Sequence, residues 1–159
     1  MLRPLQQFIC DKCKEIIETP QLGYVEYLNH LIDVNGSIIQ ITSGFRIVHH
    51  DGKNNCYYYD RTINQQTLPL SDFVGENKLN MIFSYLDEGI TISPERVGVQ
   101  VKDIREFILF AKRLTVPYFE EARLYFDQAK SNGYFDGDDG PYVYSIEKLK
   151  SIVQEFSEL

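Results

Sequence analysis

The chain has 159 residues and a mass of 18.5 kDa, which suits one domain or two small lobes that share a core. Hydrophobic residues make up 43% of it and aromatic residues 13%, so the composition excludes an intrinsically disordered chain. Its 23 Asp and Glu residues outnumber 16 Lys and Arg residues, and the net charge of −7 argues against a protein that sheathes nucleic acid, since such binding needs a basic face.

No apolar run approaches the roughly 18 residues that a membrane-spanning helix needs. The N-terminal segment has no continuous apolar stretch followed by a small-residue cleavage site, so we expect no signal peptide. Three cysteines, an odd number that includes a close pair, fit a reducing compartment better than a disulfide scaffold. The sequence therefore predicts a cytoplasmic protein that has no membrane partner.

The first sixty residues have the composition of β-strands, with many Ile, Val, Tyr, Phe and Thr residues. The predicted strands are residues 7–9, 23–28, 37–42, 45–50 and 56–60. Asn35-Gly36 predicts a tight hairpin turn, and Asp51-Gly52 begins a loop. Ser43-Gly44 interrupts an otherwise continuous strand, which predicts a bulge or bend at this point.

The polar segment 61–69 is the candidate boundary between two lobes. After it, the spacing of apolar residues changes from a period of two residues to one of about 3.6. Three helices are predicted from apolar stripes, the first of which ends at Gly89. The stripes are Leu79, Ile82, Phe83 and Leu86; Val101, Ile104, Phe107, Ile108, Ala111 and Leu114; and Tyr118, Ala122, Tyr125, Phe126 and Ala129. Residues 134–144 predict a short hairpin with an acidic tip. Ser145 is the expected N-cap of a last helix, with Leu149, Ile152, Val153 and Phe156 facing inward.

Two distant segments carry residues that are typical metal ligands. Cys10 and Cys13 form a C-x2-C motif, in which a tight turn offers two thiolates to one ion. The second segment supplies His49, His50 and Cys56. A structural zinc ion takes four such ligands, so we predict that the two segments share one site. The alternative is three unrelated cysteines, buried as small hydrophobic residues.

The geometry of the second segment decides between the two histidines. If the loop around Gly52 has an even number of residues, His49 stands opposite Cys56, with Cβ atoms roughly 4.5–5.5 Å apart. An odd loop or a bulge brings His50 opposite Cys56 instead, because a slip of one residue reverses the faces. The predicted ligands are therefore Cys10, Cys13, His49 and Cys56, with His50 as the alternative to His49.

This arrangement resembles a zinc-knuckle or zinc-ribbon module with three cysteines and one histidine, in which two ligand-bearing turns clamp one ion. The resemblance covers residues 7–60, and the second pair departs from the common ribbon because it is His-x6-Cys rather than another C-x2-C. Four available ligands, with neither an H-E-x-x-H motif nor the zinc deaminase signature, favour a closed structural zinc site over a catalytic one.

The second half of the chain offers two weaker functional patterns. Glu120 and Glu121 are spaced like a paired-carboxylate site, but the first turn of a helix, with Arg123 three residues after Glu120, favours a salt-bridged helix end. The order helix, turn, helix and hairpin over residues 102–144 resembles a winged helix-turn-helix. Residues 71–159 carry 10 Lys and Arg against 16 Asp and Glu, however, and an acidic surface would repel phosphate.

Together these patterns predict an α+β fold: a small β-rich, zinc-stapled lobe at 1–68, then a mostly helical lobe with one short hairpin at 69–159, or one compact unit of both. We expect a non-enzymatic protein-interaction or adaptor module with structural zinc and a protein partner. The alternatives are a winged-helix protein that binds nucleic acid or regulates, and a metal-dependent hydrolase.

Overall fold

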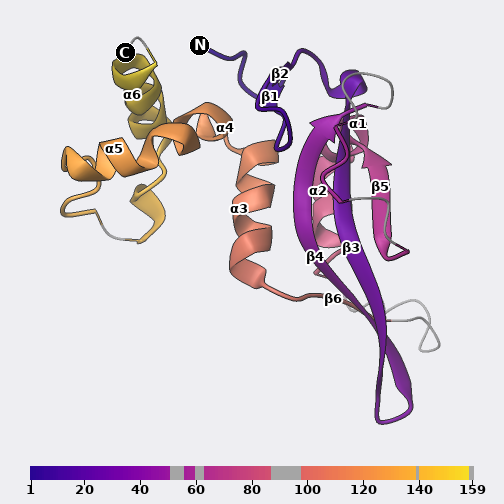
Figure 1. Ribbon diagram of the computed structural model, residues 1–159. Helices are drawn as coiled ribbons and strands as arrows, with labels where there is room; N and C mark the ends of the chain where they lie inside the picture. The colour runs from indigo at the N-terminus through magenta and orange to yellow at the C-terminus, as the bar shows by residue number, and fades with distance from the viewer. Residues whose placement is uncertain (51–55, 60–62, 87–97, 139, 158–159) are drawn as a thin grey trace.

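The computed structural model describes residues 1–50, 56–59, 63–86, 98–138 and 140–157 (Figure 1). It has the predicted α+β fold, with strands in the first part of the chain and helices towards the C-terminus. A two-stranded sheet comes first and a four-stranded sheet of order β5-β3-β4-β6 follows. The strands are β1 (Phe8–Ile9), β2 (Ile16–Ile17), β3 (Gly23–Val34), β4 (Ser37–His49), β5 (Gln65–Pro69) and β6 (Gly98–Val101).

A long antiparallel hairpin of β3 and β4 forms the centre of the larger sheet, and its tip projects away from the helices (Figure 1). Asn35 and Gly36 form its turn, both with positive φ, as the sequence predicted. The predicted bulge is also present: the register shifts opposite Tyr27, where β4 has one extra residue. Gly44 lies at the bulge with φ +69°, and a Cβ atom there would overlap the hydroxyl group of Tyr59.

Three helices cover one face of the sheet and build the first core cluster. They are α1 (Leu70–Val74), α2 (Lys78–Phe83) and α3 (Ile104–Thr115). Phe45 of β4 is the centre of the packing, with its ring 4.9 Å from that of Phe110 and 5.1 Å from that of Phe107. Burial of a large apolar side chain stabilises the fold by about 1.5–3 kcal/mol. This cluster therefore fixes α3 against β4.

The C-terminal helices form a second core cluster. They are α4 (Phe119–Ala122), α5 (Phe126–Ser131) and α6 (Ile146–Phe156), with the 3-10 helices η2 (Arg123–Tyr125) and η3 (Gly140–Tyr142); η1 (Pro20–Leu22) precedes β3. The predicted N-cap is confirmed, because Ser145 accepts a hydrogen bond from the backbone N–H of Lys148. The four residues of α6 that were expected to face inward are buried. In the part of the chain described, no helix combines the length and apolar character needed to cross a membrane.

Two predicted β segments are wrong in the described residues. Residues 56–59 form no strand, because the backbone N–H groups of Tyr58 and Tyr59 bind the carboxylate of Glu26. The predicted hairpin at 134–144 is replaced by turns and η3, with positive φ at Gly137 and Gly140. The rings of Tyr134, Phe135 and Tyr144 pack against the second cluster, so the segment folds inward.

The helical stripes were assigned to partly wrong faces. On α2, Leu79 and Phe83 are exposed, while Ile82 and the following Tyr85 are buried. On α3, Phe110 faces inward, whereas Ile104 and Ile108, which were expected to do so, are exposed. Because both helices carry apolar side chains on two faces, the sequence pattern does not decide which face is buried. The expected stop at Gly89, the loop at Asp51-Gly52 and residue Asp60 lie outside the described residues.

The division at residue 68 stays a prediction, although the first cluster contains side chains from both sides of it. The polar segment that suggested a boundary includes β5, an edge strand in which Pro69 and outward polar side chains are tolerated. Among described residues, the two clusters separate between Leu114 and Phe119. The first cluster thus joins the sheet to α1, α2 and α3.

A buried arginine links the clusters to the turn of residues 10–15, which connects β1 to β2 and is called the cysteine turn below. Arg113 of α3 donates to Asp11 Oδ2 at 2.7 Å and to the carbonyl oxygen of Ile9 at 3.3 Å. It also donates twice to Glu120 of α4, from Nε at 2.6 Å and from Nη2 at 2.9 Å. Arg123 adds two further bonds to Glu120. One guanidinium group thus holds α3, α4 and the cysteine turn together.

We predict that Arg113→Met destabilises the protein by about 3–5 kcal/mol, because it leaves the buried carboxylate of Glu120 and the largely covered carboxylate of Asp11 without their main partner. Arg3→Met is the matched control. It removes the exposed pair with Glu18, which contributes less than about 1 kcal/mol. Urea denaturation of both variants measures the difference. Equal losses would show that the Arg113 network does not stabilise the fold.

Candidate metal centre

The structure brings Cys10, Cys13, His49 and Cys56 into one group. Each offers one ligand atom, and the four atoms all lie within 4.8 Å of one another. Cys10, His49 and Cys56 are buried, Cys13 is half-buried, and none of the three cysteines is in a disulfide. The geometry therefore gives a cluster that could hold a metal ion, built from segments that are far apart in the sequence.

The cysteine turn places the first two thiols. Ile9 of β1 pairs with Ile16 of β2, and between them the N–H of Cys10 donates to Glu15 O at 2.9 Å. The N–H of Lys14 closes the turn on Cys10 O at 3.0 Å. Lys14 has φ +67°, a left-handed conformation that lets the chain reverse directly after Cys13. Both sulfur atoms consequently lie on one side of a tight turn.

Asp11 attaches this turn to β4. Its N–H donates to Ile47 O at 2.7 Å, and its carboxylate accepts the N–H of Ile47 at 2.7 Å. His49 lies two residues further along the same strand, so its side chain projects from the same face as that of Ile47. The paired bonds at Asp11 therefore set the distance between the cysteine turn and the histidine.

His49 presents Nδ1 to the cluster, 3.4 Å from Cys13 Sγ. Its Nε2 lies 3.3 Å from the carbonyl oxygen of Ile16, which can only accept, so we assign the proton to Nε2 and the free lone pair to Nδ1. Ligands at ~2.3 Å and ~2.0 Å from one zinc ion, seen at the tetrahedral angle, lie about 3.5 Å apart. The observed sulfur–nitrogen distance fits this requirement.

His50 lies outside the cluster. Its ring stacks on Tyr24 with the centroids 4.4 Å apart, and its Nε2 is 2.8 Å from the hydroxyl group of Tyr24. Of the two histidines that the sequence left open, the structure therefore brings His49 to the cysteines.

Cys56 reaches the cluster by a route different from the predicted hairpin. It is not in a strand, and the sheet residue opposite His49 is Gly23. The carboxylate of Glu26 accepts the N–H groups of Tyr58 and Tyr59 at 2.8 and 3.2 Å, which holds the segment that follows Cys56. Burial raises the pKa of Glu26, and these two bonds partly oppose that effect. Cys56 thus lies near His49 as expected, but the expected pairing of the two residues across a hairpin is wrong.

The thiols have unequal proton affinities. Burial raises the pKa of Cys10, but hydrogen bonds from the backbone of Cys13, Lys12 and His49 outweigh it and lower the value to about 7. Burial and the neighbouring Cys13 and Cys10 raise the pKa of Cys56 to about 12. N–H donors directed at Cys10 favour its thiolate, the form that ligates a metal. Of these two thiols, Cys10 is therefore the more readily deprotonated, as metal binding requires.

Three supporting residues escaped the sequence analysis: Asp11, Glu26 and Arg113. Asp11 stands inside the C-x2-C motif, and a lone acid among apolar strand residues could have drawn attention to Glu26. Nothing in the local sequence marks Arg113, whose partners are mostly distant along the chain.

Glu120 and Glu121 are buried, and the predicted bond of Glu120 to Arg123 is confirmed at 3.0 Å. Burial raises the pKa of Glu120, but the charge and hydrogen bonds of Arg113 and Arg123 outweigh it and lower the pKa overall. A carboxylate held in its ionised form serves as a salt-bridge partner and has no proton to donate. The structure therefore favours the salt-bridged helix end over a paired-carboxylate site.

Comparison with known proteins gives no relatives. No protein-family model matches the sequence, no curated protein is recognisably similar to it, and no solved structure is similar to its fold. The basis for a proposed function is therefore the cluster of three cysteines and one histidine.

We predict that Cys13→Ser, Cys56→Ser and His49→Ala each remove the bound metal and lower the melting temperature to a similar extent. Any one change empties a four-ligand site, so combining two of them should add little. His50→Ala is the matched control, since it removes the adjacent imidazole that stacks on Tyr24. Metal analysis and thermal denaturation of the purified variants measure both effects.

Two results would contradict this site. Mild and equal effects of all four changes would return the cysteines to the role of buried apolar residues. A severe His50→Ala together with a silent His49→Ala would retain a metal site but replace its histidine.

Proposed function

We propose that the protein binds one structural zinc ion through Cys10, Cys13, His49 and Cys56 and acts as a non-enzymatic protein-interaction or adaptor module. The observation that carries the proposal is the convergence of three sulfur atoms and one imidazole nitrogen within 4.8 Å. Thiolate and imidazole are the donors that zinc favours, and four of them complete its tetrahedral shell. A complete shell leaves no position for a substrate or an activated water.

The position of the ligands supports a structural role for the ion. Cys10 and Cys13 follow the two-residue strand β1, His49 ends β4, and Cys56 lies in an irregular segment. The two-residue strand and the irregular segment bury too little surface to hold their own positions, whereas β4 is a 13-residue strand inside the four-stranded sheet. A metal ion shared by all three supplies that stabilisation, because its binding free energy becomes folding free energy.

The surface supports a protein partner rather than nucleic acid. The arm of the β3–β4 hairpin exposes apolar side chains on both of its faces: Ile32 and Val34 share one face, and Leu31 and Ile38 share the other. Exposed apolar side chains on a projecting arm suit contact with a protein partner. The net charge of −7 opposes phosphate binding, and the segment expected to be the wing of a winged helix has no strand among its described residues.

We predict that the purified protein contains one zinc ion per chain. A strong chelator should remove it and lower the melting temperature, and added zinc should restore the original value. Elemental analysis and thermal denaturation test these expectations. Iron in place of zinc would direct the argument towards redox chemistry, and the absence of any stoichiometric metal would refute the proposal.

Zinc binding should also release protons in proportion to the thiols that it ionises. At pH 8 Cys10, with a pKa of about 7, is already largely a thiolate, whereas Cys56, with a pKa of about 12, still carries its proton. Binding must therefore release at least about one proton per zinc at pH 8, and affinity must rise with pH. Calorimetric titrations in buffers of different ionisation enthalpy measure the release. Zinc binding without proton release would exclude Cys56 as a ligand.

A further inference from the structure

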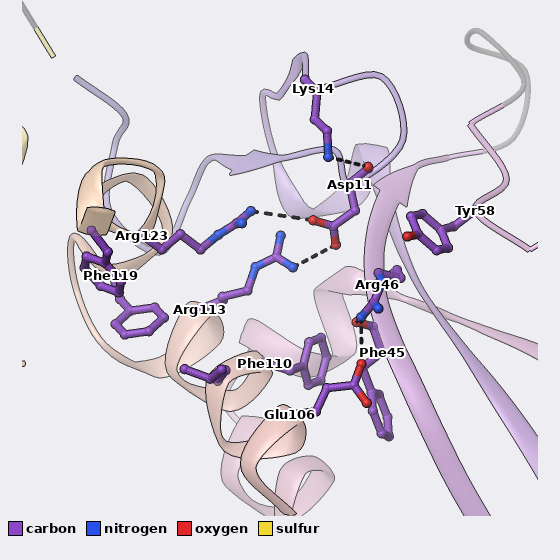
Figure 2. A pocket seen from close by; sticks show the side chains of 12 residues that line it. Asp11, Lys14, Phe45, Arg46, Tyr58, Glu106, Phe110, Arg113, Phe119 and Arg123 are labelled. Atoms are coloured by element: carbon purple, nitrogen blue, oxygen red, sulfur yellow. Dashed lines mark hydrogen bonds and ion pairs between the residues drawn. The ribbon is translucent and has the colours of Figure 1, made fainter. Parts of the chain in front are cut away.

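A cleft of about 450 Å³ opens beside the metal centre, and its function is not explained by a structural zinc ion. It lies between β4 and the helices α3, α4 and α5, with the cysteine turn at one end (Figure 2). Asp11 and Lys14 of that turn both line it. Its volume is in the range of about 300–1,000 Å³ that is usual for small-molecule sites.

One part of the cleft is apolar. Its accessible lining is the half-exposed Leu109 and the partly buried ring of Phe126, and the rings of Phe45, Phe110 and Phe119 support this surface from behind, with only 1–3% of each residue exposed. These rings are held by their neighbours: Phe45 stacks on Phe110 at 4.9 Å, and Phe119 meets Phe126 edge-on at 5.5 Å. The apolar surface is therefore already arranged before a ligand enters, which reduces the entropic cost of binding.

The charged part of the lining has more cations than carboxylates. The lining contains four cations, Lys14, Arg46, Arg113 and Arg123, and two carboxylates, Asp11 and Glu106. The buried carboxylate of Glu120, behind the wall, accepts from both Arg113 and Arg123, so one positive charge still remains in excess. In Figure 2 both arginines point towards the Asp11 carboxylate, and Lys14 lies on the other side of that residue.

Lys14 is the best candidate for the excess charge. Its Nζ donates to the backbone carbonyl oxygen of Asp11 at 2.8 Å, a neutral acceptor that leaves the ammonium charge uncompensated by this bond. Lys14 is exposed and lies directly after Cys13, at the end of the cleft formed by the cysteine turn.

We propose that this cleft binds a small organic anion with an aromatic or aliphatic body, whose charged group lies at Lys14 and whose body lies against Leu109 and Phe126. The charge and the apolar lining together select this class, since a purely polar anion would leave Leu109 and Phe126 uncovered and a neutral hydrocarbon would leave the cation excess unpaired. The binding site is additional to the structural zinc and does not depend on the proposed adaptor role.

The probe is 8-anilinonaphthalene-1-sulfonate, which joins an aromatic body to one anionic group, and N-phenyl-1-naphthylamine is the same body without the sulfonate. With the zinc-loaded protein we expect saturable fluorescence at one sulfonate probe per chain and at least about fivefold weaker binding of the neutral probe, which corresponds to one charge interaction near a protein surface. Equal affinities for the two probes, or no saturable binding, would overturn the proposal.

Matched variants locate the site. Leu109→Glu places a carboxylate at the cleft, whereas Leu124→Glu makes the same change at an equally exposed leucine that does not line it. Lys14→Gln removes the excess charge, and Lys12→Gln is its control within the same turn. We expect each cleft variant to weaken sulfonate binding about fivefold or more, with zinc content and melting temperature unchanged, and each control to bind normally. If Leu109→Glu and Leu124→Glu bind the probe alike, the cleft is not the site.

Discussion

The arrangement of this protein depends on the buried guanidinium group of Arg113. It binds Asp11 in the cysteine turn and Glu120 in α4 from its own place on α3, so three segments meet at one side chain. Burial lowers the pKa of Arg113, but Glu120 and Asp11 outweigh this effect and raise it overall. Ion pairs removed from water are costly unless every donor is satisfied. Here all three guanidinium nitrogens donate, in four hydrogen bonds, and the arginine therefore specifies the relative positions of the segments.

The metal centre and the arginine network act on the same short turn from opposite sides. Cys10 and Cys13 direct their sulfur atoms towards His49, while the side chain of Asp11, between them, points to Ile47 and Arg113. A turn of this size cannot bury enough apolar area to define its own position. The bonds of Asp11 replace part of that burial, and through them the cysteine turn is connected to both β4 and α3.

The sequence predicted what is encoded locally. The Asn35-Gly36 turn, the bulge at Gly44 and the cap at Ser145 each follow from the conformational preference of one or two residues, and the structure has all three. The cluster of ligand residues was anticipated from their chemistry. The route by which the chain brings these residues together was not predicted. The bonds of Glu26 to Tyr58 and of Arg113 to Asp11 join residues that are 32 or more positions apart, where spacing carries no signal.

The position of the cleft links it to the candidate metal centre. Since Asp11 and Lys14 belong to the cysteine turn, the charge at this end of the cleft is in place only when the turn is folded. The chain as a whole carries −7, which repels a highly charged polyanion at long range more strongly than a single local cation can attract it. A small monoanion with an apolar body experiences less of that repulsion and gains from contact with Leu109 and Phe126. The same charge distribution that opposes nucleic acid thus remains compatible with a small amphipathic anion.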